Sequence, residues 1–157
     1  MQKITPCLWF DNNAEAAVKF YASIFKGTKT LHILRNGDIG PGKKGSVLTI
    51  LFKLRDEKFL ALNGGPQFKF NHAVSFMVNC KNQKEIDFYW DKLSKGGTKE
   101  PCGWVKDKFG LSWQIVPADM MKLHGNGETK AGQRVMAAML KMKKLDIATL
   151  EKAHAGK

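Results

Sequence analysis

The sequence carries one order of elements twice, and this repeat is the feature that most restricts the fold. A strand, a helix and further strands are predicted over residues 4–63, and the same order follows over residues 72–117. The halves align with Phe20-Tyr21 on Phe88-Tyr89 and Trp9-Phe10 on Met77-Val78. Because 157 residues suit one domain or two small modules, we predict a repeated module. A single α+β domain with coincidental similarity is the alternative.

Hydrophobic spacing and breaker residues locate the elements of the first half. Residues 4–10 predict a strand, and Asn12 or Asn13 is placed to cap a helix over 14–25, which Gly27 ends. Strands are predicted over residues 28–34, 46–54 and 58–63. The glycine-rich segment 36–45 is a loop between the first two of these strands.

The second half gives the same reading. We predict a strand over 72–80, a helix over 83–95 capped by Asn82, and strands over 100–107 and 111–117. Residues 118–157 predict one or two helices, with Asp146 as the cap of the last. We therefore divide the chain into a two-module domain over 1–118, with modules at 1–65 and 70–118, and a helical extension over 119–157.

Charge does not point to a specific acidic partner. The formal net charge is +12, of which residues 1–64, 65–118 and 119–157 carry +5, +3 and +4. The basic run Lys141, Lys143 and Lys144 is explained by a solvated helix face. There is no arginine-rich arm and no aromatic signature of an RNA-binding strand, so we do not expect nucleic-acid binding. General attraction to anionic ligands stays open.

The sequence also bears on location. No apolar run approaches the roughly 18–20 residues that span a bilayer, and the first residues do not form a secretory signal. Cys7, Cys80 and Cys102 are three in number with no close pair, which fits a reducing compartment better than a disulfide framework. We expect a cytoplasmic protein that does not enter a membrane.

Two motifs connect the chain to a known family. The predicted helix contains Ala17-Val18-Lys19-Phe20-Tyr21 and is followed by Phe25-Lys26-Gly27, and the last hairpin reads Asp-Lys-Phe-Gly-Leu-Ser-Trp-Gln over 107–114. With these motifs the chain resembles the vicinal oxygen chelate superfamily, also called glyoxalase/bleomycin-resistance/dioxygenase proteins. Within it, the chain is most similar to the PhnB-like group, often labelled 3-demethylubiquinone-9 3-methyltransferase.

This resemblance implies a fold and a kind of site. The fold class is α+β: two βαβββ-type modules form a paired half-barrel mixed sheet around a cavity, with C-terminal helices added. Enzymes of the superfamily hold a divalent metal there through four His or Glu side chains, and the metal acts as a Lewis acid.

The residues at the implied ligand positions do not suit a metal. These positions hold Thr5, Ala73, Gln114 and, in a loose register, Asn63. None is an imidazole or a carboxylate, so we predict no metal site. His72 begins the predicted strand over 72–80, and alternation turns it away from the face of Ala73. We interpret His72 as a partly exposed residue at the strand end.

Strand alternation also selects candidate ligand contacts. The inward set is mostly apolar with a few polar groups, which suits a small planar or amphipathic molecule. The alternative is that these side chains only fill the sheet interior. Cys7 has no paired His or acid at a recognisable spacing, so we interpret it as a buried structural thiol. The candidates are Thr5, Cys7, Trp9, Asn63, Ser75, Met77, Trp104 and Gln114.

Together these arguments favour a cytoplasmic protein of the PhnB-like group that binds a small organic ligand without a metal or other cofactor. The alternative is an enzyme of the same superfamily, namely a methyltransferase, a lyase or a dioxygenase. The glycines of segment 36–45 lie between two predicted strands, which is not the strand–turn–helix arrangement of a nucleotide-cofactor site. We also predict a homodimer, with the methionine-rich helix over 131–145 covering a sheet edge or meeting the partner.

Overall fold

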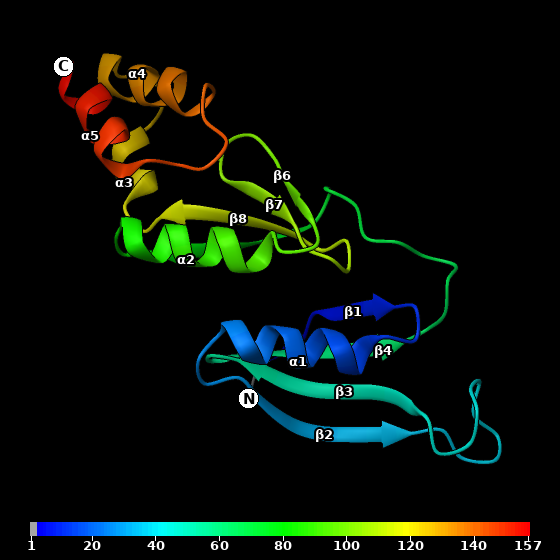
Figure 1. The fold of residues 1–157 in the computed structure, drawn as a ribbon. Coiled ribbons are helices and arrows are strands. Elements are labelled where there is room, and N and C mark those ends of the chain that lie inside the picture. The colour runs from blue at the N-terminus through cyan, green and yellow to red at the C-terminus, as the bar shows by residue number, and fades with distance from the viewer. Residues whose placement is uncertain (1–2) are drawn as a thin grey trace. The chain divides into compact units, whose positions relative to one another are not determined.

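The computed structural model describes residues 3–157 and divides the chain into two compact units, with the boundary between Phe70 and Asn71 (Figure 1). Each unit contains one sheet and one long helix on it, and the second unit also contains the C-terminal helices. Among the described residues, no helix has the length and apolar character needed to cross a bilayer.

The first unit is a four-stranded mixed sheet with one helix. Its elements are β1 (Cys7–Phe10), α1 (Ala14–Ile24), β2 (Lys29–Arg35), β3 (Val47–Leu54) and β4 (Glu57–Asn63). The strand order is β1-β4-β3-β2, in which β1 runs parallel to β4 and the other pairs are antiparallel.

The second unit repeats this topology. Its elements are β5 (Ser75–Cys80), α2 (Gln83–Leu93), β6 (Thr98–Lys99), β7 (Trp104–Lys106) and β8 (Ser112–Pro117). The order β5-β8-β7-β6 and the parallel pair β5–β8 match the first unit strand for strand. The predicted α+β fold of two repeated modules is confirmed; each sheet is open, and neither closes on itself as a barrel.

One face of each sheet is buried under its helix. In β1, Leu8 and Phe10 are buried while Cys7 and Trp9 on the opposite face are not, as strand alternation requires. Tyr21 of α1 is fully buried on the covered side. The second unit buries Trp90 of α2 and Trp113 of β8 in the same way. The helix-free face of each sheet is therefore where a ligand has access.

Most element boundaries agree with the prediction to within one residue, and a few differ by more. The strand predicted from residue 4 begins at Cys7. The strand predicted from residue 72 begins at Ser75, because residues 72–74 form a turn. The helix predicted to residue 95 ends at Leu93. The strand predicted over 100–107 is shortened to β7, because Cys102 has a left-handed φ of 59° and Gly103 one of 81°, which turns the chain before Trp104. The two-residue strand β6 lies outside the predicted range.

The C-terminal segment forms three helices where one or two were predicted: α3 (Met120–His124), α4 (Lys130–Met139) and α5 (Ile147–Ala155). The predicted helix over 131–145 was too long. After α4 the chain leaves helical geometry, and the carbonyl groups of Met142 and Lys143 accept hydrogen bonds from the amides of Cys102 and Gly103. The predicted caps Asn82 and Asp146 are confirmed, accepting from the Glu85 and Thr149 amides at 3.0 and 2.8 Å.

These helices share a core with the second sheet. The apolar cluster joins β8 to all three helices and to the segment before α5 through Val116, Met120, Val135, Leu145 and Leu150. Gln83 of α2 strengthens this attachment: its Nε2 donates to the Leu145 carbonyl at 3.1 Å, and its Oε1 accepts from the Ile147 amide at 2.9 Å. The C-terminal helices are thus packed parts of the second unit.

Asp107 organises the last hairpin. It is almost completely buried, and its carboxylate accepts from the amides of Phe109 and Leu111 at 2.8 and 3.1 Å and from the Trp113 indole at 2.9 Å. A buried carboxylate is tolerated only where donors replace its water shell. The aspartate of the motif over 107–114 is therefore explained by the structure of the turn.

We predict that Asp107→Ala lowers the free energy of unfolding by about 3 kcal/mol, because the Trp113 indole and two amides lose their acceptor. Urea denaturation followed by circular dichroism measures the change. Asp56→Ala, at an aspartate whose side chain is 98% exposed, serves as the control and should change stability by less than about 0.5 kcal/mol. Equal stability of the two variants would contradict this role.

Candidate functional site

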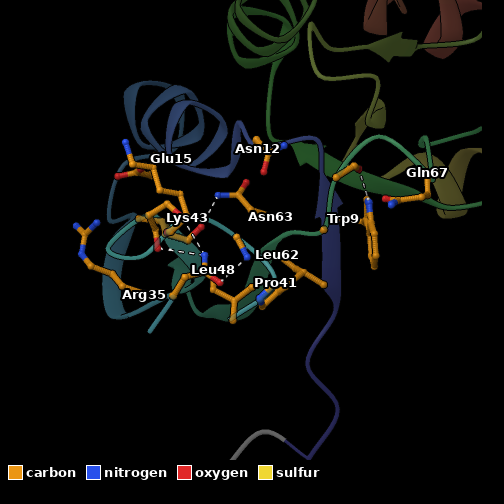
Figure 2. A pocket seen from close by; sticks show the side chains of 16 residues that line it. Trp9, Asn12, Glu15, Arg35, Pro41, Lys43, Leu48, Leu62, Asn63 and Gln67 are labelled. Carbon is orange, nitrogen blue, oxygen red and sulfur yellow. Dashed lines mark hydrogen bonds between the residues drawn. The ribbon is translucent and has the colours of Figure 1, made fainter. Parts of the chain in front are cut away.

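A pocket with a volume of about 720 Å³ lies at one end of the first sheet. At this end β1, β2 and β4 finish and β3 begins, and the first turn of α1 contributes from the covered side. Figure 2 shows the side chains that line it. They come from the strand ends, from the loop over 36–46 and from the segment after β4: Trp9, Asn12, Glu15, Arg35, Asn36, Pro41, Gly42, Lys43, Ser46, Val47, Leu48, Leu62, Asn63, Gly64, Gly65 and Gln67.

Trp9 forms a fixed aromatic wall. Its indole Nε1 donates to the Gly65 carbonyl at 2.8 Å (Figure 2). Its ring meets Phe68 edge-on at a centroid distance of 5.0 Å. Gly64 passes so close that an added Cβ would lie 2.3 Å from the ring. The indole is therefore held by a hydrogen bond, by an aromatic contact and by close packing, which leaves a preorganised apolar surface.

Asn63 lines the pocket but its amide already has structural partners. The Nδ2 atom donates to the Val47 carbonyl at 2.9 Å, and Oδ1 accepts from the Ala14 amide at 2.9 Å. Asn63 therefore joins the start of β3 to the first turn of α1. The predicted cap needs correction here, because Asn13 is the N-cap residue yet makes no side-chain cap bond, and Asn63 supplies that bond instead.

The loop over 36–46 is built around the buried Asn36. Its Oδ1 accepts from the Gly42 amide at 3.2 Å, and its Nδ2 donates to the Ser46 hydroxyl at 2.9 Å. A Cβ at Gly40 or Gly42 would lie 2.5 or 2.8 Å from the Asn36 amide, so both glycines are needed for this close wrapping. The glycines predicted as a loop between two strands thus shape one side of the pocket.

Charge at the pocket is net positive. Arg35 and Lys43 face a single acid, Glu15, among the lining residues. The Arg35 guanidinium donates to the Gly45 carbonyl at 3.0 Å, and Lys43 makes no ion pair within residues 3–157. Sequence reasoning did not select these residues. The available signal was their position at the end of a strand and in a long loop, where binding groups are often found.

The second unit also brings predicted site residues together. Met77 pairs with Gln114 and Gln114 with Trp104 in the sheet register, so the three side chains share the face that α2 leaves open. Ser75 lies on the same face, and its hydroxyl accepts a hydrogen bond from Gln114 Nε2 at 2.9 Å. Thr5 of the first unit lies before β1 and is exposed.

His72 is exposed, as predicted, but the alternation argument used for it does not apply, because β5 begins only at Ser75. Its Nε2 lies 2.9 Å from Oε2 of Glu100, and its ring centroid is 6.3 Å from that of Trp104. Lys106 Nζ is 4.0 Å from the same carboxyl group. The imidazole is thus paired with a carboxylate beside the open face.

The side chains at the four implied ligand positions do not fit the divalent metal that the fold family implies. In the sheet register Trp9 pairs with Leu62, just as Met77 pairs with Gln114. The residue of the first unit that is equivalent to Gln114 is therefore Leu62, and the prediction that placed the implied metal ligand at Asn63 needs this correction. Thr5, Leu62, Ala73 and Gln114 together offer a hydroxyl and an amide. Residues 3–157 also contain no group of three or more His, Cys, Asp and Glu that could hold an ion. We derive no chemistry through a metal.

The interpretation of Cys7 as a buried thiol was wrong, because the residue is exposed. It lies on the helix-free face next to Trp9 along β1. Desolvation by neighbouring atoms nevertheless raises the pKa of the Cys7 thiol above its ordinary value. Since a raised pKa reduces the thiolate fraction, Cys7 is accessible but not activated.

Comparison with known proteins supports the same fold. Residues 2–116 match the sequence profile of the family described as 3-demethylubiquinone-9 3-methyltransferase. A PhnB protein from Bacillus cereus that carries this methyltransferase name is 35% identical and has a TM-score of 0.66, with 74% of this chain and 100% of that chain covered. No curated protein sequence matches the chain.

More distant structures share the fold alone. Protein PA1353 from Pseudomonas aeruginosa is 19% identical with a TM-score of 0.60, over 73% of this chain and 96% of that chain. The fosfomycin resistance protein FosX from Mesorhizobium loti is 13% identical with a TM-score of 0.50, over 73% and 91%.

We predict that Gly64→Ala displaces the Trp9 ring, because the new Cβ would lie 2.3 Å from it. The indole signal of Trp9 in ¹H–¹⁵N spectra should shift, and the free energy of unfolding should fall by about 1–3 kcal/mol. Gly37→Ala is the matched control, since nothing lies within 4 Å of a Cβ there. An unchanged Trp9 signal in Gly64→Ala would show that the ring is not held as described.

We predict slow alkylation of Cys7 by iodoacetamide near neutral pH, with a rate that rises as pH approaches the raised thiol pKa. Cys80 should react more slowly still, because it is buried and its burial, followed by the Glu85 charge, raises its pKa to about 12. Mass spectrometry of timed samples gives the order. Modification of Cys7 faster than free glutathione would instead identify an activated nucleophile.

Proposed function

Because the chain belongs to the 3-demethylubiquinone-9 3-methyltransferase family, the PhnB-like group of the vicinal oxygen chelate superfamily, we propose that it binds a small organic ligand. The ligand is a planar or amphipathic anion, and it occupies the pocket at the end of the first sheet without a metal. The observation that carries this proposal is the indole of Trp9, fixed by Gly65 at the edge of a pocket of about 720 Å³.

The size and chemistry of the pocket support this ligand class. Small-molecule sites commonly enclose about 300–1,000 Å³ and combine apolar walls with a few placed polar groups. Here the apolar side chains of the lining are those of Trp9, Pro41, Val47, Leu48 and Leu62. The excess of Arg35 and Lys43 over Glu15 favours a negatively charged group on the ligand.

The absence of suitable ligands at the implied metal positions supports binding without a metal. A leucine and an alanine replace two of the four donors, and the Gln114 amide already donates to Ser75. In the second unit, Ser75, Met77, Trp104 and Gln114 stay predicted ligand contacts. Thr5 in the first unit stays one as well.

An enzyme of the same family, whose name describes a methyl transfer, is the alternative. The glycines that would suit a nucleotide cofactor lie in the loop between β2 and β3, and no helix follows them. A lyase or dioxygenase of the superfamily would need the metal that the donor set does not fit. Binding alone is therefore the better supported function.

A cytoplasmic location and a homodimer complete the proposal. The edge strand β2 supports the dimer, because all seven of its residues are exposed, including the apolar side chains of Leu31, Ile33 and Leu34. An exposed apolar edge of this kind is normally covered by a partner.

We predict that 2-naphthoate, a planar aromatic anion, shifts the amide signals of the pocket residues in ¹H–¹⁵N spectra and that Trp9→Ala weakens its binding about tenfold, through loss of the aromatic contact. Phe88→Ala, which removes an exposed aromatic ring from α2, is the control and should leave the affinity unchanged. Equal affinity of both variants would contradict the assignment.

Two further measurements test the charge of the ligand and separate the proposed function from the methyltransferase alternative. The uncharged 2-naphthamide should bind more weakly than the anion, and Lys43→Ala should remove part of that difference. Saturable binding of S-adenosylmethionine, with no response to 2-naphthoate, would favour the methyltransferase over the proposed function.

A further inference from the structure

The C-terminal helices form a second concave surface, separate from the pocket of the first unit. A groove of about 620 Å³ lies between α4 and α5, which pack against each other. All its lining residues fall between Arg134 and Lys157, beyond residue 116, where the match to the family ends. The groove therefore calls for an explanation that the family does not supply.

The floor of the groove, taken as its uncharged lining residues, is mostly apolar. It contains the methyl groups of Ala137 and Ala138 from α4 and of Ala153 from α5, together with Met142 and Thr149. Side chains this short allow the backbone of a third helix to approach the pair closely, in the way that helices pack through ridges and grooves. Met142 adds an adaptable apolar contact.

The rim of the groove is basic. Arg134 is fixed in place, because its Nε and one terminal nitrogen donate to the carbonyls of Ala153 and His154, both at 2.7 Å. Lys141 and Lys157 also line the groove and form no ion pair within residues 3–157. The one acid, Asp146, is engaged as the cap of α5 by the Thr149 amide and hydroxyl.

We propose that this groove docks an acidic amphipathic helix of a partner protein. An apolar floor between cations is complementary to a helix with an apolar stripe flanked by Glu or Asp. A second copy of this chain docked groove to groove would bring Arg134, Lys141 and Lys157 against their own counterparts. A nucleic acid would find no aromatic side chain among the lining residues on which a base could stack. A membrane surface engages protruding apolar side chains, whereas this surface is concave.

The dimensions of α4 set the size of the partner segment. Its 10 residues span about 15 Å, which corresponds to about three helical turns of the partner. Such a helix would present apolar side chains spaced three, four and seven residues apart toward the floor, with acidic residues on either side of them near Arg134 and Lys141.

The test uses the full chain, labelled with ¹⁵N, and a synthetic peptide of about 14 residues in which leucines recur at helical spacing and the other positions are mostly Glu. The expected result is saturable shifts in the amides of α4 and α5, with none at the pocket of the first unit. Lys141→Glu should weaken binding about tenfold. Lys19→Glu makes the same charge change on an exposed position of α1 and should have no effect.

Two control peptides distinguish docking from general attraction. A peptide of the same composition with its leucines scattered around the helix should bind at least about tenfold more weakly. A peptide with Lys in place of each Glu should not bind. The proposal is overturned if the acidic peptide leaves the α4 and α5 signals unchanged, if both acidic peptides bind equally well, or if Lys141→Glu and Lys19→Glu weaken binding to the same extent.

Discussion

The parallel pairing of the first and last strand of each module is the constraint on which the rest of the structure depends. Two parallel neighbours cannot be joined by a tight turn, so the chain must travel between them, and in both units it does so through a helix and two antiparallel strands. The helix covers one face of the sheet, and in the first unit alternate residues of β3 such as Ile50 and Phe52 are buried. The other face has no cover within the unit, and it is there that Trp9 and Gln114 lie.

The pocket of the first unit follows from the same parallel pairing of the first and last strand. Where β1 and β4 finish together, Phe10 pairs with Asn63, and the Asn63 amide joins α1 to β3. The chain then turns through Gly64, where an added Cβ would meet the Trp9 ring, and Gly65, which has a positive φ of 90° and whose carbonyl accepts from the Trp9 indole. Structural hydrogen bonds and a candidate binding surface therefore occupy the same few residues, so that a change meant to test binding there must also be tested for stability.

Much of the fold was predictable from the sequence, because period-two and helical spacing locate strands and helices whose faces are buried. The repeated order, both long helices and the caps Asn82 and Asp146 follow from local signals. The start of β7 at Trp104 was not predictable, since it depends on Cys102 adopting a left-handed φ, and the end of α4 depends on backbone bonds to residues about 40 positions away. Of the candidate site, Trp9 and Asn63 were selected by strand position. Arg35, the last residue of β2, and Lys43, in the loop that follows, were missed because a strand end and a loop carry no periodicity.

The central claim is that this member of the family binds a small organic anion through its own side chains alone. Isothermal titration of the full chain with 2-naphthoate, before and after exhaustive treatment with a chelator and again with Ni²⁺, Zn²⁺ or Mn²⁺ added, tests it most directly. The account predicts one affinity under all of these conditions, because it assigns every ligand contact to side chains of the pocket lining, among which Glu15 is the one carboxylate and there is no His or Cys. Binding that disappears with the chelator and returns with one of the metals would contradict the account.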